Sequence, residues 1–227
     1  MAEDCKHVLA RQKLKNHIVD TAVRLFRENG IKSVTMDEVA ASLTISKRTL
    51  YEVFPDKETL LIEVVKVGQT EADMYARQVV ATAKNVLEVL LKLFKYSIQR
   101  FHATNPKFFQ DMKRYPKAFD LLTKKNHKDS TMAVKFFHEG VKQGIFRDDI
   151  NFSIVHQLMR EQFNVLLHSD ICNQYSFVEV YESIMFTHLR GISTERGAHE
   201  LEQFILTYRA ERDYSNEEET DIVSNND

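Results

Sequence analysis

The chain has 227 residues, of which 43% are hydrophobic and 28% charged, so it has enough apolar material for one or two folded domains, and wholesale disorder is excluded. It contains only 6 glycines, 3 prolines and no tryptophan, too few turn-forming residues for an all-β protein. The composition therefore favours helices.

Charge is unevenly distributed along the chain. The formal net charge is −2, from 31 basic and 33 acidic residues. Residues 211–227 hold seven of the acidic residues and one arginine, which leaves 30 basic and 26 acidic residues, a net +4, in the rest. Near the N-terminus, residues 5–19 contain no acidic residue. Such a segment suits either contact with a polyanion or a solvated tail.

The cysteines and the apolar runs indicate the compartment. Cys5 and Cys172 lie far apart, which predicts neither a disulfide framework nor a metal site. The N-terminus lacks the apolar stretch of a signal peptide, and no apolar run reaches the roughly 20 residues of a membrane span. We therefore expect a cytoplasmic protein without a membrane contact.

The first predicted helix contains Leu14 and ends at Gly30, where glycine is suited to a left-handed C-terminal cap. Its apolar residues recur at the spacing of one helical face: Leu14, Ile18, Ala22, Leu25 and Phe26.

Two short helices are predicted next. Thr35 and Glu38 have the spacing of a capping box, which opens a helix of about two turns. Ser46 is a natural N-cap for the following helix, and Pro55 stops it. Residues 10–55 thus predict three helices.

The rest of the chain also has helical periodicity, so the predicted fold class is all-α. We expect a DNA-binding domain with an N-terminal arm over residues 1–56, a helical bundle for dimerisation and ligand binding over 57–211, and an acidic disordered tail over 212–227. The predicted helices are 57–82, 85–104, 107–115, 117–142, 151–168, 176–190 and 195–210.

The second and third helices have the features of a helix-turn-helix. Their turn is Leu43-Thr44-Ile45-Ser46. Leu50 and Phe54 would hold the third helix against its support, so that its free face is presented rigidly, as reading of base edges requires. That face carries Lys47, Arg48, Thr49 and Tyr51.

Residues 35–60 read TMDEVAASLTISKRTLYEVFPDKETL. This stretch closely resembles the N-terminal domain of the tetracycline-repressor (TetR) family, and the resemblance extends over about residues 14–65. Thr44 departs from the family, which usually has glycine in the turn. If the backbone at Thr44 has a positive φ, the β-branched side chain costs about 1 kcal/mol or more.

The resemblance implies a set of DNA contacts. Lys47 and Arg48 would approach base edges or neighbouring phosphates, and the other members would bind the phosphate backbone. The full set is Thr35, Ser46, Lys47, Arg48, Thr49, Tyr51 and Lys57. The basic residues Arg11, Lys13 and Lys15 would extend along the duplex.

The resemblance also implies that the larger domain forms a homodimer and holds a ligand. Helices 176–190 and 195–210 are the candidate dimer helices, although their apolar residues could instead form the core of one subunit. A small apolar or aromatic effector would contact six residues, of a kind that more often belongs to an ordinary core: Phe101, Phe137, His156, Met159, Gln162 and Phe163.

No phosphate-binding loop, dinucleotide-binding glycine pattern, nucleophile elbow or zinc-protease helix is present, so we predict neither an enzyme nor a cofactor. The predicted function is a ligand-responsive repressor that binds a palindromic operator in double-stranded DNA as a homodimer. The alternative is an α-helical adaptor that binds only protein.

Overall fold

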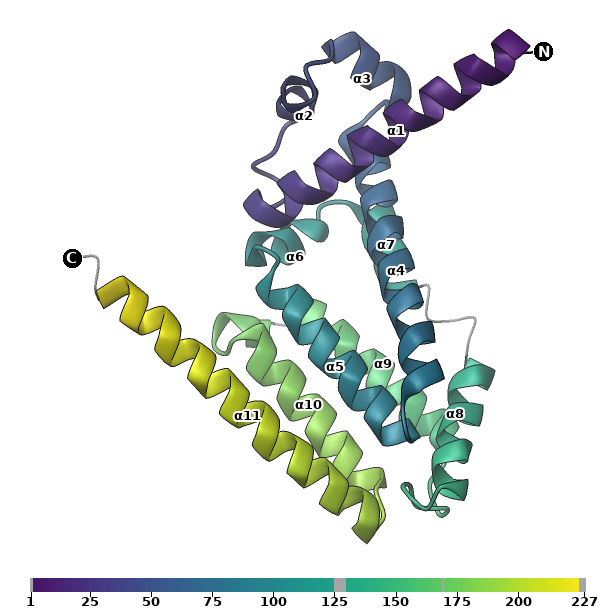
Figure 1. Cartoon of the computed structure of the whole chain (residues 1–227), viewed down its shortest axis with the longest axis vertical. Coiled ribbons are helices and arrows are strands. Elements are labelled where there is room, and N and C mark those ends of the chain that lie inside the picture. Colours follow the sequence, from purple (N-terminus) through teal and green to yellow (C-terminus); the bar gives the residue numbers. More distant parts are fainter. Residues whose placement is uncertain (1, 125–129, 169, 225–227) are drawn as a thin grey trace. The chain divides into compact units, whose positions relative to one another are not determined.

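The computed structural model describes residues 2–124, 130–168 and 170–224 (Figure 1), and side chains within 7–123, 131–162, 166, 171, 172 and 174–212. Every regular element in these ranges is helical. The helices are α1 (Ala2–Asn29), α2 (Met36–Ser42), α3 (Lys47–Val53), α4 (Lys57–Thr82), α5 (Val86–His102), α6 (Pro106–Met112), α7 (Pro116–Lys124), α8 (Ser130–Lys142), α9 (Phe152–His168), the 3₁₀ helix η2 (Asp170–Asn173), α10 (Phe177–Ile192) and α11 (Glu195–Ser224). The all-α prediction is therefore confirmed.

The predicted helix boundaries differ from the structure at several points. Helix α1 begins at Ala2, before the predicted range 10–55 of the three N-terminal helices, and the predicted helix 117–142 contains both α7 and α8. Residues 125–129, between these two helices, lie outside the described part. Helix α11 continues to Ser224, through most of the predicted tail, and no proline interrupts it. Residues 225–227 lie outside the described part.

The chain divides into two compact units. The first comprises residues 1–81 and 94–128, and the second 82–93 and 129–227. Helix α5 contributes its C-terminal half to the first unit and its N-terminal half to the second. The predicted division at residue 56 is a functional one, and it stays a prediction; the first compact unit includes α4, α6 and α7 as well.

The core of the first unit joins the three N-terminal helices to α4, α6 and α7. Phe26, Leu50 and Phe54 are almost completely buried, and Leu61 of α4 and Met112 of α6 belong to the same cluster. Burial of each such side chain contributes about 1.5–3 kcal/mol. Helix α3 is thus held by a core that extends well beyond the three helices predicted from sequence.

Gly30 ends α1 with φ +82°, which confirms the left-handed cap predicted there. Its amide donates to the carbonyl of Phe26 at 3.0 Å. A Cβ at this position would lie 2.8 Å from the Cβ of Lys107 in α6, so a side chain would be excluded by packing as well as by the backbone.

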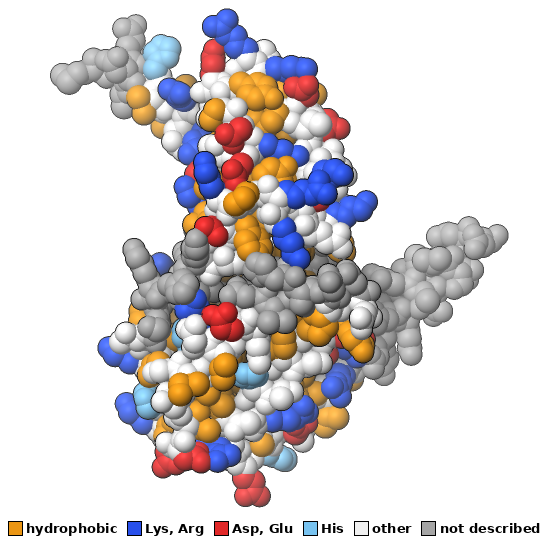
Figure 2. Space-filling view, turned by 180° about the vertical axis from the view of Figure 1, so that it is seen from behind, with side chains coloured by type: hydrophobic (Ala, Val, Ile, Leu, Met, Phe, Trp, Pro, Cys, Tyr) orange, Lys and Arg blue, Asp and Glu red, His pale blue; other side chains and the backbone are white. Residues whose placement is uncertain are grey.

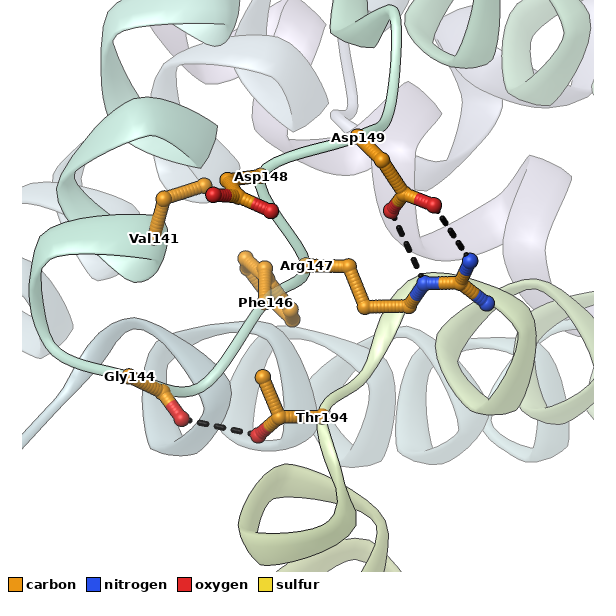
Figure 3. A pocket seen from close by; sticks show the side chains of 7 residues that line it. All are labelled: Val141, Gly144, Phe146, Arg147, Asp148, Asp149 and Thr194. Carbon is orange, nitrogen blue, oxygen red and sulfur yellow. Dashed lines mark hydrogen bonds and ion pairs between the residues drawn. The ribbon is translucent and has the colours of Figure 1, made fainter.

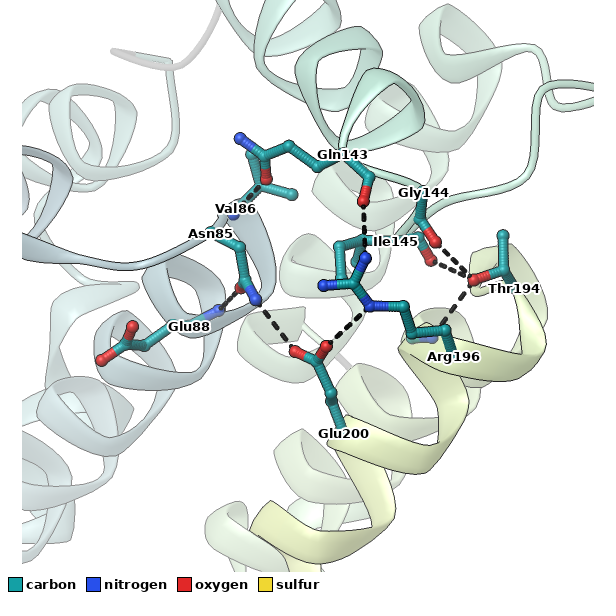
Figure 4. A network of polar contacts seen from close by, with 10 residues as sticks. Asn85, Val86, Glu88, Gln143, Gly144, Ile145, Thr194, Arg196 and Glu200 are labelled. Atoms are coloured by element: carbon teal, nitrogen blue, oxygen red, sulfur yellow. Dashed lines mark hydrogen bonds and ion pairs between the residues drawn. The ribbon is translucent and has the colours of Figure 1, made fainter.

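In the second unit, the segment after α8 packs against the junction of α10 and α11. The amide of Thr194 donates to the carbonyl of Ile145 at 3.0 Å. Figure 4 shows the surrounding network, in which Glu200 accepts from Asn85 at 2.9 Å and from Arg196 at 3.2 Å. Gly197 permits the close approach of α11 to the backbone of Ile145, because a Cβ on residue 197 would lie 2.2 Å from the Ile145 carbonyl oxygen.

Candidate nucleic-acid interface

The turn between α2 and α3 is a Schellman motif. The amide of Ile45 donates to the carbonyl of Ala40 at 3.1 Å, and that of Thr44 to Ala41 at 3.0 Å. Thr44 has φ +56°, in the left-handed region where glycine is preferred. The β-branched threonine therefore carries backbone strain at the point that sets the angle between the two helices.

Side-chain caps fix the starts of both helices, as predicted. Thr35 and Glu38 form the predicted capping box, in which the Glu38 amide donates to Thr35 Oγ1 at 3.1 Å. The hydrogen bonds from Thr35 lower the pKa of Glu38 below its usual value. Ser46 Oγ accepts from the amide of Thr49 at 3.0 Å and lies 2.8 Å from Thr49 Oγ1. These bonds define where α2 and α3 begin.

Helix α3 is seated on the core by one face and exposed on the other. Leu50 is fully buried, whereas Lys47 and Arg48 are exposed, and Tyr51 is 46% exposed. Buried apolar side chains prevent the helix from rotating, so the exposed groups keep fixed positions relative to one another. The structure brings together on one surface the cationic and phenolic groups predicted to contact DNA.

Both cations of this surface are paired with carboxylates of the same chain. Lys47 donates to Asp37 of α2, and this hydrogen bond raises the pKa of Lys47. Arg48 donates from Nε to Glu52 Oε1 at 2.9 Å. Sequence reasoning missed both acidic partners. The spacing of four residues signals the second pair, but the first is formed across the turn and has no periodic signal.

Lys57 does not lie free on this surface. Its ammonium donates to the carbonyl of Ile31 and sits 5.6 Å from the centre of the Phe26 ring. Burial lowers the pKa of Lys57 below its usual value. The phosphate contact inferred for this residue from family resemblance thus competes with an internal role.

The basic residues of the N-terminal arm lie on α1. Arg11 Nη2 donates to the carbonyl of Glu52 at 3.4 Å, and Lys13 is exposed. Lys15 pairs with Glu63 at 2.9 Å. Helix α1 therefore places Arg11 beside the C-terminal end of α3, whereas Lys15 is bound to α4.

Mixed charge is visible in Figure 2, where basic side chains on the face of the first unit in view alternate with acidic ones. The arrangement differs from a uniformly positive patch. The attraction of the α3 surface for a polyanion therefore depends in large part on whether Lys47 and Arg48 leave their carboxylate partners.

The six residues predicted to contact an effector have different surroundings in the described structure, and that they line one site stays a prediction. Phe101 belongs to the first unit and contacts Phe109. Phe137 is buried and stacks on Phe152 at 5.2 Å, as an ordinary core residue does. The side chain of Phe163 lies outside the described residues.

The remaining three, His156, Met159 and Gln162, are half-buried on α9. Burial is the main cause that lowers the pKa of His156, with the charge of Arg160 contributing. Gln162 Oε1 is buried and has no hydrogen-bond partner among the described residues. An unsatisfied amide oxygen costs about 1–3 kcal/mol and is a position where a hydrogen-bond donor would be stabilising.

A surface cavity of about 470 Å³ lies elsewhere in the second unit (Figure 3). None of the residues predicted to contact an effector lines it. Arg147 and Asp149 at its edge pair through two bonds of 2.9 and 2.5 Å, so their charges compensate each other. No cluster of metal-ligating side chains occurs in the described ranges, and none of the helices there has the length and apolar character of a membrane span.

Comparison with known proteins shows which family these helices resemble. Residues 18–64 match the model for bacterial regulatory proteins of the tetR family. The HTH-type transcriptional repressor KstR2 of Mycolicibacterium smegmatis is 28% identical over 152 residues, which cover 65% of this chain and 74% of that protein.

Two solved structures show the same fold. The ketosteroid transcriptional regulator KstR2 of Mycobacterium tuberculosis matches with a TM-score of 0.52 and 23% identity, over 80% of this chain and 95% of that one. A putative transcriptional regulator from Saccharomonospora viridis, in complex with choline, matches with a TM-score of 0.63 and 18% identity, over 81% and 100%.

Proposed function

Because this chain belongs to the TetR family of transcriptional regulators, which are not enzymes, we propose that it is a repressor that binds a palindromic operator as a homodimer and releases it when a small effector binds. The observation that carries the proposal is the seating of α3. Its apolar face is buried, and its opposite face presents Lys47, Arg48 and Tyr51.

The proposed contacts divide by chemistry. Arg48 donates to guanine in the major groove, and Lys47 contacts a base edge or a neighbouring phosphate. Tyr51 and Thr49 bind the phosphate backbone, as do Thr35 and Ser46 at the helix starts, where free amides favour an anion. The proposed set excludes Lys57, because its ammonium is engaged by Ile31 and Phe26.

A homodimer supplies the second recognition helix. One α3 of seven residues reads only a few base pairs, so specific binding needs two half-sites about 34–36 Å apart. Helices α10 and α11 bury part of their apolar residues within the subunit, namely Val180, Met185, Leu189, Leu201, Ile205 and Tyr208. The proposed contacts with a partner subunit come from half-buried residues of the same two helices: Phe177, Tyr181, Ile184 and Phe204.

The effector site is proposed on α9, around the unpartnered oxygen of Gln162. Met159 supplies an apolar surface and His156 a second polar group. A small, largely apolar or aromatic molecule with one hydrogen-bond donor fits this set. The effector can release DNA only to the extent that it binds more tightly to the conformation of the protein that does not bind the operator.

Substitution of Arg48 tests the role of α3. Genomic fragments retained by the protein provide the specific duplex, and a scrambled duplex provides the non-specific one. Arg48→Ala is expected to weaken specific binding by about 1–3 kcal/mol and to change non-specific binding little. Arg24→Ala is the matched control, since Arg24 is also an exposed arginine paired with a glutamate four residues later. Equal losses on both duplexes for Arg48→Ala would exclude base reading by Arg48.

A further inference from the structure

Glu52 is an exposed acidic side chain of α3, four residues after Arg48 and on the same face of the helix. It precedes the last residue of the helix, Val53. Its side chain is 61% exposed and that of Arg48 is 89% exposed, with 2.9 Å between Arg48 Nε and Glu52 Oε1. The carboxylate and the guanidinium therefore lie side by side, one helical turn apart, on the proposed DNA-reading surface.

Two electrostatic effects oppose a carboxylate at this position. The C-terminal end of a helix carries partial negative charge, and a surface that approaches DNA meets phosphates. The ion pair with Arg48 compensates little, because exposed pairs contribute weakly and an acidic residue after its basic partner is the less favourable order. Stabilisation of α3 does not account for Glu52.

The chemistry of the major groove gives the carboxylate a use. Cytosine presents the N4 amino group there as a donor, which glutamate accepts, whereas guanine presents the acceptors N7 and O6, which arginine binds. The described bond of Arg48 to Glu52 uses Nε, and the two terminal guanidinium nitrogens carry the other N–H donors of the group. The pair thus offers an acceptor and a set of donors side by side, one helical turn apart.

We propose, on the basis of the proposed function, that Glu52 is a specificity-determining residue. Its carboxylate accepts a hydrogen bond from the N4 amino group of one cytosine in each half-site. Arg48 donates to a guanine within one base pair of that cytosine. The partner is duplex DNA whose half-sites contain this cytosine at a fixed position.

Selection from randomised duplexes by the full-length protein tests the proposal. The wild type is expected to enrich one site with a cytosine preferred roughly tenfold or more over other bases at one position of each half-site. Glu52→Gln should lose that preference, move it towards adenine, and keep the preferences at the other positions. Glu52→Ala should lose it without the gain of adenine.

The matched control is Glu28→Gln, which removes the same charge from an exposed pair, Arg24–Glu28 at 3.2 Å on α1. It should select the wild-type site. Thermal unfolding of each variant is measured alongside, and no change is expected for these exposed side chains.

Three results would overturn the role of Glu52. One is an unchanged site for Glu52→Gln with uniformly tighter binding to all duplexes, which would make Glu52 only a repelling charge. The others are a wild-type site that lacks the cytosine, and loss of all selection by folded Glu52→Gln. A wild type that enriches no sequence would instead refute the proposed function itself, and the inference with it.

Discussion

Thr44 is the residue at which the turn of the DNA-reading motif stores strain. Its φ of +56° is unfavourable for a β-branched side chain, and the two Schellman hydrogen bonds hold the backbone there. The turn therefore keeps its geometry at a cost to the stability of the first unit.

Replacement by glycine should relieve this cost. A left-handed residue with a Cβ costs about 1–2 kcal/mol, and the extra freedom of glycine in the unfolded chain offsets about 0.5–1 kcal/mol. Thr44→Gly is expected to raise the free energy of unfolding by about 0.5–1 kcal/mol, measured by urea denaturation. Thr44→Ala is the control and should change little, because it keeps the Cβ. Equal stability of the two variants would show that φ is not strained.

Substitution of Lys57 tests whether this residue stabilises the fold or contacts DNA. Lys57→Ala removes the hydrogen bond to Ile31 and the contact with Phe26, so we expect a loss of about 1–2 kcal/mol in the free energy of unfolding. The slope of log affinity against log salt should stay unchanged. A slope smaller by about one would instead show that Lys57 neutralises a phosphate.

The same side chain predicts a dependence on pH. Burial lowers the pKa of Lys57 in the folded state, so the unfolded state binds more protons between that pKa and the usual value of 10.5. The stability that Lys57 contributes therefore rises as pH increases through this interval. The difference in unfolding free energy between wild type and Lys57→Ala should grow from pH 8 to pH 10; a constant or shrinking difference would contradict the burial of the ammonium.

At the scale of elements, the junction of α10 and α11 depends on close approach of two backbones. Gly197→Ala would place a Cβ 2.2 Å from the Ile145 carbonyl oxygen, and a backbone atom cannot move aside as a flexible side chain can. We expect destabilisation by about 1–3 kcal/mol.

Gly191 is the matched control, because a Cβ on this residue of α10 would meet nothing within 4 Å. Gly191→Ala should stabilise the helix by about 0.5–1 kcal/mol. Thermal unfolding of both variants gives the comparison. The same shift in both would mean that helix propensity, and not the contact with Ile145, governs this junction.

The sequence predicts elements well where the signals are local. Capping residues set the starts of α2 and α3, and an Asp56 side chain that accepts from the amide of Thr59 at 2.7 Å sets that of α4. The length of α11 was not predictable from the same signals. The acidic composition of its final residues indicated disorder, and no glycine or proline after residue 210 marks where the helix ends.

The sequence predicted which residues of α3 are exposed at the candidate site, but not the ion pairs and hydrogen bonds that they form. The exposed face of α3 follows from periodicity, because the apolar positions identify its buried side. The bond from Lys47 to Asp37 and the use of Lys57 inside the first unit depend on how separate helices pack. Such contacts have no fixed sequence spacing.

For the whole molecule, the proposed function requires two copies of α3 on one duplex. Each copy supplies few base contacts, so affinity for an operator over bulk DNA depends on the pair acting together. The half-buried apolar residues of α10 and α11 are the proposed means of pairing.

The most direct test is the mass and sequence preference of the complex that the purified protein forms with genomic fragments in excess competitor DNA. We expect retention of a small set of fragments, each with inverted half-sites about one helical turn apart and an even number of chains bound. A single bound chain, or equal retention of every fragment, would contradict the proposed function.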